Sequence, residues 1–264
     1  MDPRLRELLS SEDRDQVQQG CELAVALGDG ALPYLSSGVR ISKQGHLMLQ
    51  SSLGKLFQPS HRLWGALCLL AATGRVAEVE VLDIDRGPAP PQLHSLTPLQ
   101  GASRLRRLTL QRCAWLTSLS PLSDLPSLSS LTLRLCTRLR HLAPLAKLPK
   151  LSRLSLFNCT MIEDHHALGD FPALRRLVLR HPRPHTITLP EALLGRLAHL
   201  ELGDGLQLSE LSSLSAGRRL RVLRLEGCRQ LSDLSSLSEM TALSELVVTE
   251  GMQLSDLSPL WGLP

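Results

Sequence analysis

The chain has 264 residues, of which 43% are hydrophobic and 20% charged. It is therefore long enough to bury a full core, and its composition excludes an intrinsically disordered protein. The net charge of +4 is too mild to indicate nucleic-acid binding without a concentrated basic segment. Aromatic residues make up only 3% of the chain, while leucine recurs every two or three positions, a bias typical of repeat proteins.

The first residues carry charges of both signs and lack the apolar segment of a secretory signal. The longest apolar run, Ala66 to Ala72, is too short to cross a bilayer. We therefore expect a cytoplasmic protein with no membrane span, in which the six cysteines are buried reduced thiols rather than disulfides.

Residues 1–75 predict a helical N-terminal cap. Ser10 to Asp13 are typical of a helix start, and an apolar face follows that ends before Gly28. A second helix is predicted from about Ser60 to Gly74, whereas residues 29–58 are ambiguous. The apolar stripes of the two helices are Val17, Cys21, Ala24 and Leu27, and Leu63, Trp64, Leu67 and Leu70. Such a cap would cover the apolar edge of a repeat array, and a small interaction domain is the alternative.

Residues 76–264 are built from about eight repeats with a 23-residue period. The pattern LxxLxL begins at seven leucines in constant phase: Leu105, Leu128, Leu151, Leu174, Leu197, Leu220 and Leu243. We place a degenerate first unit on Val76, Val79 and Val81, 29 residues before Leu105, Leu108 and Leu110, with the six extra residues at 87–92.

The two halves of each unit predict different local structures. The alternation in LxL indicates a strand with leucines inward, and the strands of successive units must stack in parallel. The three-residue leucine period of the second half favours 3₁₀-like turns on the convex side. Prolines share one phase there, and short acidic side chains precede the turns as candidate caps. These residues are Pro121, Pro144 and Pro259, and Asp164, Asp233 and Asp256.

The hexads resemble those of the leucine-rich-repeat family over residues 75 to 264, and the short units are similar to internalins and to the sensor arms of bacterial signalling ATPases. The resemblance implies an α/β solenoid, an arc with a parallel concave β-sheet that serves as a recognition module. Where the family usually has asparagine at the turn after each strand, this chain has Cys113, Cys136, Cys159, Pro182, Gly205, Cys228 and Gly251. Because proline and glycine have no side-chain donor, we expect the ladder to break in those units, with local distortion around residues 181–185.

The outward residues of the strands should form columns on the concave face. Arginines lie in the middle of the columns and acidic residues at both ends, with Glu78 and Glu80 at the first end. We predict that this basic centre binds a protein with an acidic surface, with Phe157 as an interface anchor. The predicted partner-binding residues are Arg107, Arg134, Arg153, Phe157, Arg176 and Arg180.

Two alternatives to this interpretation stay open. The arginines and Phe157 are also the residue types that hold phosphates and stack bases, although the acidic ends argue against an extended nucleic acid or other polyanion. The protein would otherwise be a secreted effector that binds a host protein.

Candidate chemistry is sparse. Asp83 and Asp85 share one side of a strand end, as in a weak cation site, but a solvated strand end is the simpler interpretation. Cys159 belongs to the inward column, whereas His165 and His166 belong to the convex half, so they predict no zinc site or nucleophile. We expect no enzyme activity, small-molecule substrate, cofactor or metal.

The last residues, Leu263 and Pro264, have the phase of Leu125 and Pro126 inside a repeat, with no polar capping unit after them. We therefore expect an apolar C-terminal edge that self-association, a partner or further chain covers.

Overall fold

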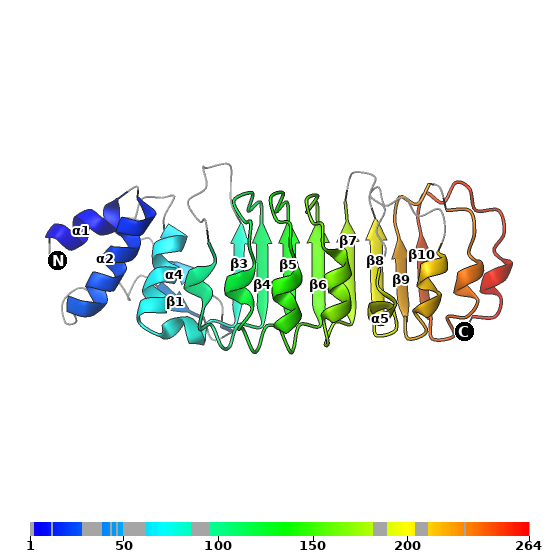
Figure 1. Ribbon diagram of the computed structural model, residues 1–264, viewed down its shortest axis with the longest axis horizontal. Coiled ribbons are helices and arrows are strands. Elements are labelled where there is room, and N and C mark those ends of the chain that lie inside the picture. The colour runs from blue at the N-terminus through cyan, green and yellow to red at the C-terminus, as the bar shows by residue number, and fades with distance from the viewer. Residues whose placement is uncertain are drawn as a thin grey trace.

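The computed structural model describes residues 3–11, 13–27, 39–42, 44–45, 47–49, 62–85, 95–181, 189–203, 211–229 and 231–263. Its strands stand side by side along the long axis of an elongated molecule, with α1 and α2 at one end and the last coil at the other (Figure 1). The described part of the chain contains an eight-stranded parallel sheet in sequence order, from β3 at one edge to β10 at the other. This is the predicted leucine-rich-repeat solenoid.

Each repeat contributes one strand to this sheet. From β4 onward, neighbouring strands pair 23 residues apart, for example Arg107 with Ser130 and Ser130 with Arg153, as the hexads predict. The strands are β3 (Val81–Asp85), β4 (Arg107–Gln111), β5 (Ser130–Arg134), β6 (Arg153–Phe157), β7 (Arg176–Arg180), β8 (His199–Gly203), β9 (Val222–Leu225) and β10 (Glu245–Val248).

The predicted placement of the first unit was wrong by three residues. Leu82 pairs with Leu108 and Ile84 with Leu110, a step of 26 residues instead of 29. The apolar pattern allows both placements of the first hexad, because Val79 can be its first or its second apolar position. The strand forms where Leu82 and Ile84 are both buried and Asp83 between them is exposed.

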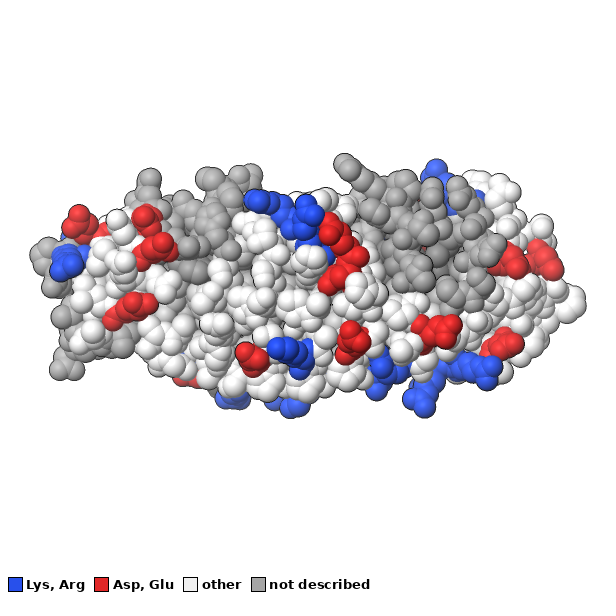
Figure 2. Space-filling model, in the orientation of Figure 1, with Lys and Arg blue, Asp and Glu red and all other residues white. Residues whose placement is uncertain are grey.

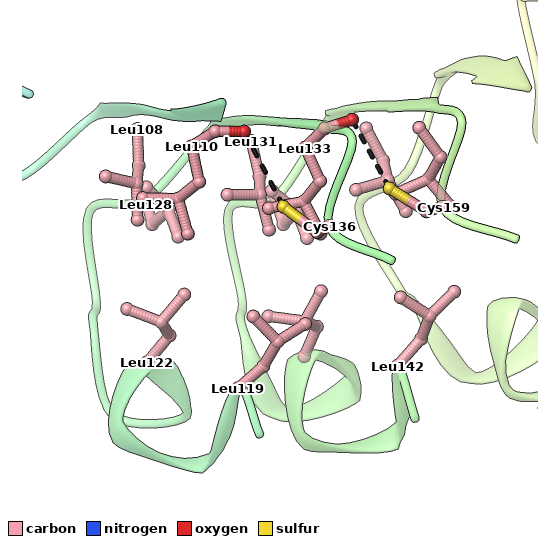
Figure 3. Close-up of a cluster of buried hydrophobic side chains, with 14 of the residues drawn as sticks. Leu108, Leu110, Leu119, Leu122, Leu128, Leu131, Leu133, Cys136, Leu142 and Cys159 are labelled. Atoms are coloured by element: carbon pink, nitrogen blue, oxygen red, sulfur yellow. Dashed lines mark hydrogen bonds between the residues drawn. The ribbon is translucent and has the colours of Figure 1, made fainter. Parts of the chain in front are cut away.

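The leucines of the hexads form one continuous core. Leu108, Leu110, Leu131 and Leu133 have no exposed surface and face leucines of the opposite turns, such as Leu122 and Leu142 (Figure 3). Burying a leucine side chain contributes about 1.5–3 kcal/mol. Because each coil contributes the same rows, the core extends unbroken from coil to coil.

Two of the repeat cysteines, Cys136 and Cys159, bond their coils to the preceding coils. The Cys136 thiol donates to the Leu110 carbonyl oxygen (3.7 Å), and the Cys159 thiol to that of Leu133 (3.6 Å) (Figure 3). All six cysteines are free and buried. Of the three positions where we predicted the ladder to break, Pro182 and Gly205 lie outside the described residues, and Gly251 in the last coil has no side chain that could bond the preceding coil.

The convex side consists of short turns, as predicted. Most are 3₁₀ turns, and the α-helical turn α5 (Glu191–Leu194) takes this place between β7 and β8. The 3₁₀ turns of the repeats are η3 (Thr97–Leu99), η4 (Ser120–Leu122), η5 (Ala143–Lys147), η6 (His165–Asp170), η7 (Ser212–Ala216), η8 (Ser235–Leu237) and η9 (Ser258–Leu260). Prolines stand in the first positions of η3, η4, η5 and η9, where an N–H is not needed.

Two of the three predicted acidic caps bind their own turns. Asp233 accepts a hydrogen bond from the Ser235 backbone N–H (2.7 Å), and Asp256 accepts one from that of Ser258 (2.8 Å). Asp164 instead accepts from the backbone N–H groups of Leu142 and Ala143 in the preceding coil, at 2.8–3.0 Å. It is 9% exposed and therefore acts as a buried clamp between coils.

Helices pack at the start of the solenoid, as predicted. They are α1 (Pro3–Ser10), which the sequence did not predict, α2 (Arg14–Leu27) and α4 (Arg62–Ala72). Asp13 caps α2 by accepting from the Asp15 backbone N–H (2.7 Å). Helix α4 packs between α2 and the turns η2 (Arg75–Glu78) and η3, and Leu67 and Leu70 are buried. The side chains of Leu63 and Trp64 lie outside the described residues.

A hairpin from the ambiguous segment joins the edge of the sheet. Strands β1 (Val39–Ile41) and β2 (Leu47–Leu49) are antiparallel, and the Gly45 carbonyl between them accepts from the N–H groups of Glu80 and Val81 (3.0 and 3.1 Å). Gly45 has a left-handed φ of 77°, and a β-carbon there would lie 2.4 Å from Glu80 Cβ. Only glycine allows this approach.

The last coil that the structure describes exposes apolar side chains. Met252, Leu257 and Trp261 are 80%, 55% and 86% exposed. Coverage of this edge by self-association, a partner or further chain stays a prediction. Among the described residues, no helix has the length and apolar character needed to cross a membrane.

Candidate protein-interaction surface

The predicted outward residues lie on the sheet in two rows. The first residues of β4 to β8 are neighbours across the strands, and so are the last residues of β4 to β7. The first row contains Arg107, Ser130, Arg153, Arg176 and His199, and the second contains Gln111, Arg134, Phe157 and Arg180. The six residues predicted to bind a partner therefore divide between the two ends of the strands.

We call Arg107, Arg153 and Arg176 the arginine row. All three side chains are exposed, and none forms an ion pair with a carboxylate among the residues that the structure describes. Arg153 pairs directly with Arg176 in the sheet register. Adjacent like charges destabilise a sheet, so the folded protein gains nothing electrostatically from this row.

His199 ends the arginine row on β8. Burial and then the neighbouring Arg176 guanidinium lower the pKa of its imidazole, so the ring is uncharged at neutral pH. Its Nε2 lies 3.8 Å from Glu201 Oε2. The basic character of the row therefore stops at Arg176.

Phe157 lies beside an arginine on each neighbouring strand. The Arg134 guanidinium carbon lies 4.4 Å from the centre of the Phe157 ring, in a cation–π contact. On the other side, Arg180 donates to Glu201 from Nε (2.7 Å) and from Nη2, and to Glu226 from Nη2 (2.6 Å). A β-carbon at Gly203 would lie 3.2 Å from Glu226 Cβ and 3.5 Å from Arg180 Cγ. The absence of a side chain at Gly203 therefore leaves room for the ion-paired triad of Arg180, Glu201 and Glu226.

The carboxyl ends of β4 to β7 surround a cavity that we call the rim pocket. Its volume is about 530 Å³, and its lining residues are Gln111, Arg134, Leu135, Phe157, Asn158 and Arg180. Leu135 and Asn158 follow their strands with left-handed φ values of 54° and 55°. Their backbone N–H groups donate to the carbonyls of Phe157 and Arg180 (both 2.8 Å), which fixes the pocket wall.

Leu135 and Asn158 were not predicted as site residues. Both residues occupy the repeat position just before the cysteine column, and this shared position is a signal in the sequence that could have indicated them. At that position Arg112, Gly227 and Glu250 also have positive φ, whereas His181 does not. Leucine is the one apolar residue in this group, but only the structure shows that it is 40% exposed.

The acidic residues predicted at the start of the groove lie elsewhere. Glu78 pairs with Arg75 at 3.3 Å, within η2, and Glu80 pairs with Arg104 before the sheet. Asp83 takes the outward position on β3, paired with Thr109. The acidic residues at the other end are ion-paired, as in Glu245 with Arg224 (2.6 Å).

The weaker chemical candidates do not assemble into a site. Cys159 is buried, and hydrogen bonding to Cys136 raises the pKa of its thiol well above the usual range. His165 instead stacks edge-on against His181, with ring centres 6.4 Å apart. In the part of the chain that the structure describes, no three potential metal ligands gather. Asp83 is exposed, and the Asp85 side chain lies outside that part.

Solved structures of known proteins share the fold of this chain. No protein-family model and no curated protein matches the sequence. Internalin C2 from Listeria monocytogenes matches with a TM-score of 0.58 at 25% identity, over 72% of this chain and 79% of the internalin. Internalin F from the same bacterium matches with a TM-score of 0.51 at 15% identity, over 99% and 96%.

The protein thus has the fold of a leucine-rich-repeat solenoid and is similar in architecture to bacterial internalins. Its likeness to internalin C2 supports, in general terms, a role as a protein-interaction module.

Proposed function

We propose that the protein is a non-enzymatic interaction module whose concave sheet binds a protein with an acidic surface. The observation that carries this proposal is the arginine row, whose three side chains have no carboxylate partner among the residues that the structure describes. Elsewhere the chain pairs arginines with glutamates of the next coil, as in Arg140 with Glu163 and Arg229 with Glu250. On the face seen in Figure 2, basic and acidic groups lie next to each other in several places. Carboxylates of a partner would provide the ion-pair partners that the arginines of this row do not have within the described chain.

Phe157 and Arg134 extend the surface from the arginine row to the rim pocket. Phe157 is half-buried and stacked with Arg134, and aromatic residues and arginine are both enriched at protein interfaces. Arg180 differs from the other predicted residues, because Glu201 and Glu226 already neutralise it. We propose that Arg180 positions Phe157 and that the other five residues contact the partner.

Nucleic acid is the competing partner class. The arginine row and Phe157 would suit phosphates and bases, but Glu201 and the exposed Asp83 lie on the same sheet, Glu226 directly follows β9, and these carboxylates would repel an extended polyanion. A compact acidic protein surface can cover the arginines alone. The predicted cytoplasmic location and the effector alternative stay predictions.

The test is capture of partners from the native host, identified by mass spectrometry and then measured with purified protein. We expect the variant R153E/R176E to weaken binding at least about tenfold, because each reversal removes a charge-assisted hydrogen bond of roughly 1.5–3 kcal/mol and adds repulsion. We expect F157A to weaken binding by roughly 2 kcal/mol.

A matched control is R138E/K147E, which reverses two exposed charges outside the sheet, Lys147 being part of η5. It should bind like the wild type. Equal affinity of R153E/R176E and the wild type would rule out the concave arginine row. Tight retention on heparin with a steep salt dependence would favour the polyanion instead.

A further inference from the structure

The rim pocket contains a leucine that the fold does not require. Leu135 combines an exposed apolar side chain with a left-handed backbone, two features that are each unfavourable in a folded chain. At the equivalent position after β9, Gly227 has a φ of 71° without that steric conflict. A glycine would therefore satisfy the turn after β5, and the side chain of Leu135 is available for an external contact.

The pocket also holds polar groups that are ready to bind an anion. Arg134 stacks on Phe157 and forms no ion pair with the described carboxylates, so its N–H groups remain available for a carboxylate. The amide groups of Gln111 and Asn158 line the same cavity, and neither side chain is hydrogen-bonded to another described residue. Three groups that can donate hydrogen bonds thus surround one apolar wall.

The side of the pocket formed by Arg180 disfavours the binding of a second negative charge. Arg180 is held by Glu201 and Glu226, so this triad carries one more negative than positive charge. A second anion placed there would meet repulsion, while one beside Arg134 would not. The volume of about 530 Å³ lies in the range of ligand pockets, 300–1,000 Å³, and exceeds what one side chain needs.

We propose that the rim pocket binds a glutamate or aspartate of a partner protein together with the apolar side chain next to it. The carboxylate pairs with Arg134 and the amides of Gln111 and Asn158, and the apolar side chain packs on Leu135 and Phe157. This proposal rests on the proposed function, since it assigns one recognition element to the same protein partner. The rim pocket would make binding depend on the amino-acid sequence of the partner, whereas the arginine row depends only on the partner's negative charge.

The test uses acetyl-Glu-Leu-amide as a probe, with binding followed by chemical-shift changes in ¹⁵N-labelled protein. We expect weak binding that shifts the Leu135 and Asn158 backbone signals and the Gln111 and Asn158 side-chain amides. Acetyl-Gln-Leu-amide should bind about tenfold more weakly to the wild type, as should acetyl-Glu-Leu-amide to R134Q, because both changes remove one charge-assisted hydrogen bond. R138Q, a matched change of an exposed arginine outside the pocket, should bind like the wild type.

A second variant tests the apolar half of the pocket. L135G keeps the left-handed turn and removes the side chain, so it should weaken acetyl-Glu-Leu-amide and leave acetyl-Glu-Ser-amide unchanged. Unperturbed amide spectra away from the pocket show that both variants fold. Shifts outside the pocket, or equal binding of the Glu and Gln probes, would overturn the proposal.

The two proposals fail in different ways. If R153E/R176E abolishes binding of the captured partner while R134Q and L135G do not, the rim pocket is excluded and the arginine row stands. If R153E/R176E leaves partner binding intact, the proposed function is wrong even where the dipeptide probe occupies the pocket.

Discussion

The thiols of Cys136 and Cys159 link adjacent coils, and we expect the raised pKa values of the buried thiols to make the stability of the protein depend on pH. A hydrogen bond with the Cys113 thiol, together with burial, raises the pKa of Cys136 to about 12 from a usual value of 9.0. Burial raises the pKa of Cys228 to about 11. These groups stay protonated in the folded state at pH values where the unfolded chain has already lost the proton.

The sign of the pH effect follows from this difference. The stabilisation is complete below about pH 9 and is lost as the pH rises toward the folded values near 11 and 12. We expect the free energy of unfolding of C136A to fall less than that of the wild type between pH 8 and 10.5, by about 1–2 kcal/mol. Urea unfolding at a series of pH values measures it.

C228A provides the matched comparison, because its thiol has the smaller shift and should therefore account for a smaller part of the alkaline loss. Parallel pH profiles for the wild type and C136A would contradict the link between the cysteine ladder and stability.

Some residues of the candidate site could be predicted from the sequence, and the contacts of others could not. The arginine row and Phe157 were predictable because outward positions follow from the two-residue period of a strand. The ion pairs of Arg180 were not, because Glu201 and Glu226 come from the two following coils and Glu226 packs closely against Gly203. A repeat pattern predicts the face of the sheet on which a side chain lies, but it does not predict which residues of other coils that side chain contacts.

At the scale of elements, Asp164 clamps one turn to the coil before it. Replacing it with alanine leaves the buried N–H of Leu142 and the partly buried N–H of Ala143 without their acceptor. We expect D164A to lose about 2–4 kcal/mol of unfolding free energy, since each unsatisfied buried donor costs about 1–3 kcal/mol. Chemical denaturation would measure this loss, and D164N, which keeps one acceptor oxygen, should lose less.

D233A is the control for this prediction, because Asp233 is exposed and caps only its own turn. Its loss should be clearly smaller than that of D164A. Equal losses would mean that Asp164 acts as an ordinary surface cap.

The hairpin β1–β2 depends on one glycine at its contact with β3. We expect G45A to separate the hairpin from the sheet edge, because the added β-carbon would meet Glu80 at 2.4 Å. Hydrogen exchange should then speed up at the amides of Glu80 and Val81, whose bonds to Gly45 are lost. The amides of Arg106 and Arg107, bonded to the Glu80 carbonyl, serve as an internal reference and should change less.

The elements themselves were predicted unevenly. The 23-residue period fixed seven strands and their register, since a shift by one residue would turn every leucine toward solvent. The first strand was misplaced because a shift of three residues leaves apolar residues at the hexad positions in either frame. The hairpin had no periodic signal at all, because its strands are three residues long and are positioned by contact with β3.

At the scale of the whole molecule, burial is unequal along the solenoid. The leucines of β5 and β6 have no exposed surface, whereas all four residues of β10 are only partly buried. Because repeats are stabilised mainly by their neighbours, we expect hydrogen exchange in β10 to be fastest and exchange in β5 and β6 slowest. Exchange measured by mass spectrometry tests this order, and uniform protection from β4 to β10 would contradict it.

The buried cysteines give this solenoid a set of position-specific unfolding probes. Cys21 and Cys68 mark the N-terminal helices, while Cys113, Cys136, Cys159 and Cys228 each mark one coil. A thiol that is buried and protonated does not react with an alkylating reagent, so it becomes labelled only when its own segment opens. The order in which the six sites become modified in mild denaturant would trace the route by which the array comes apart, without introducing any foreign label.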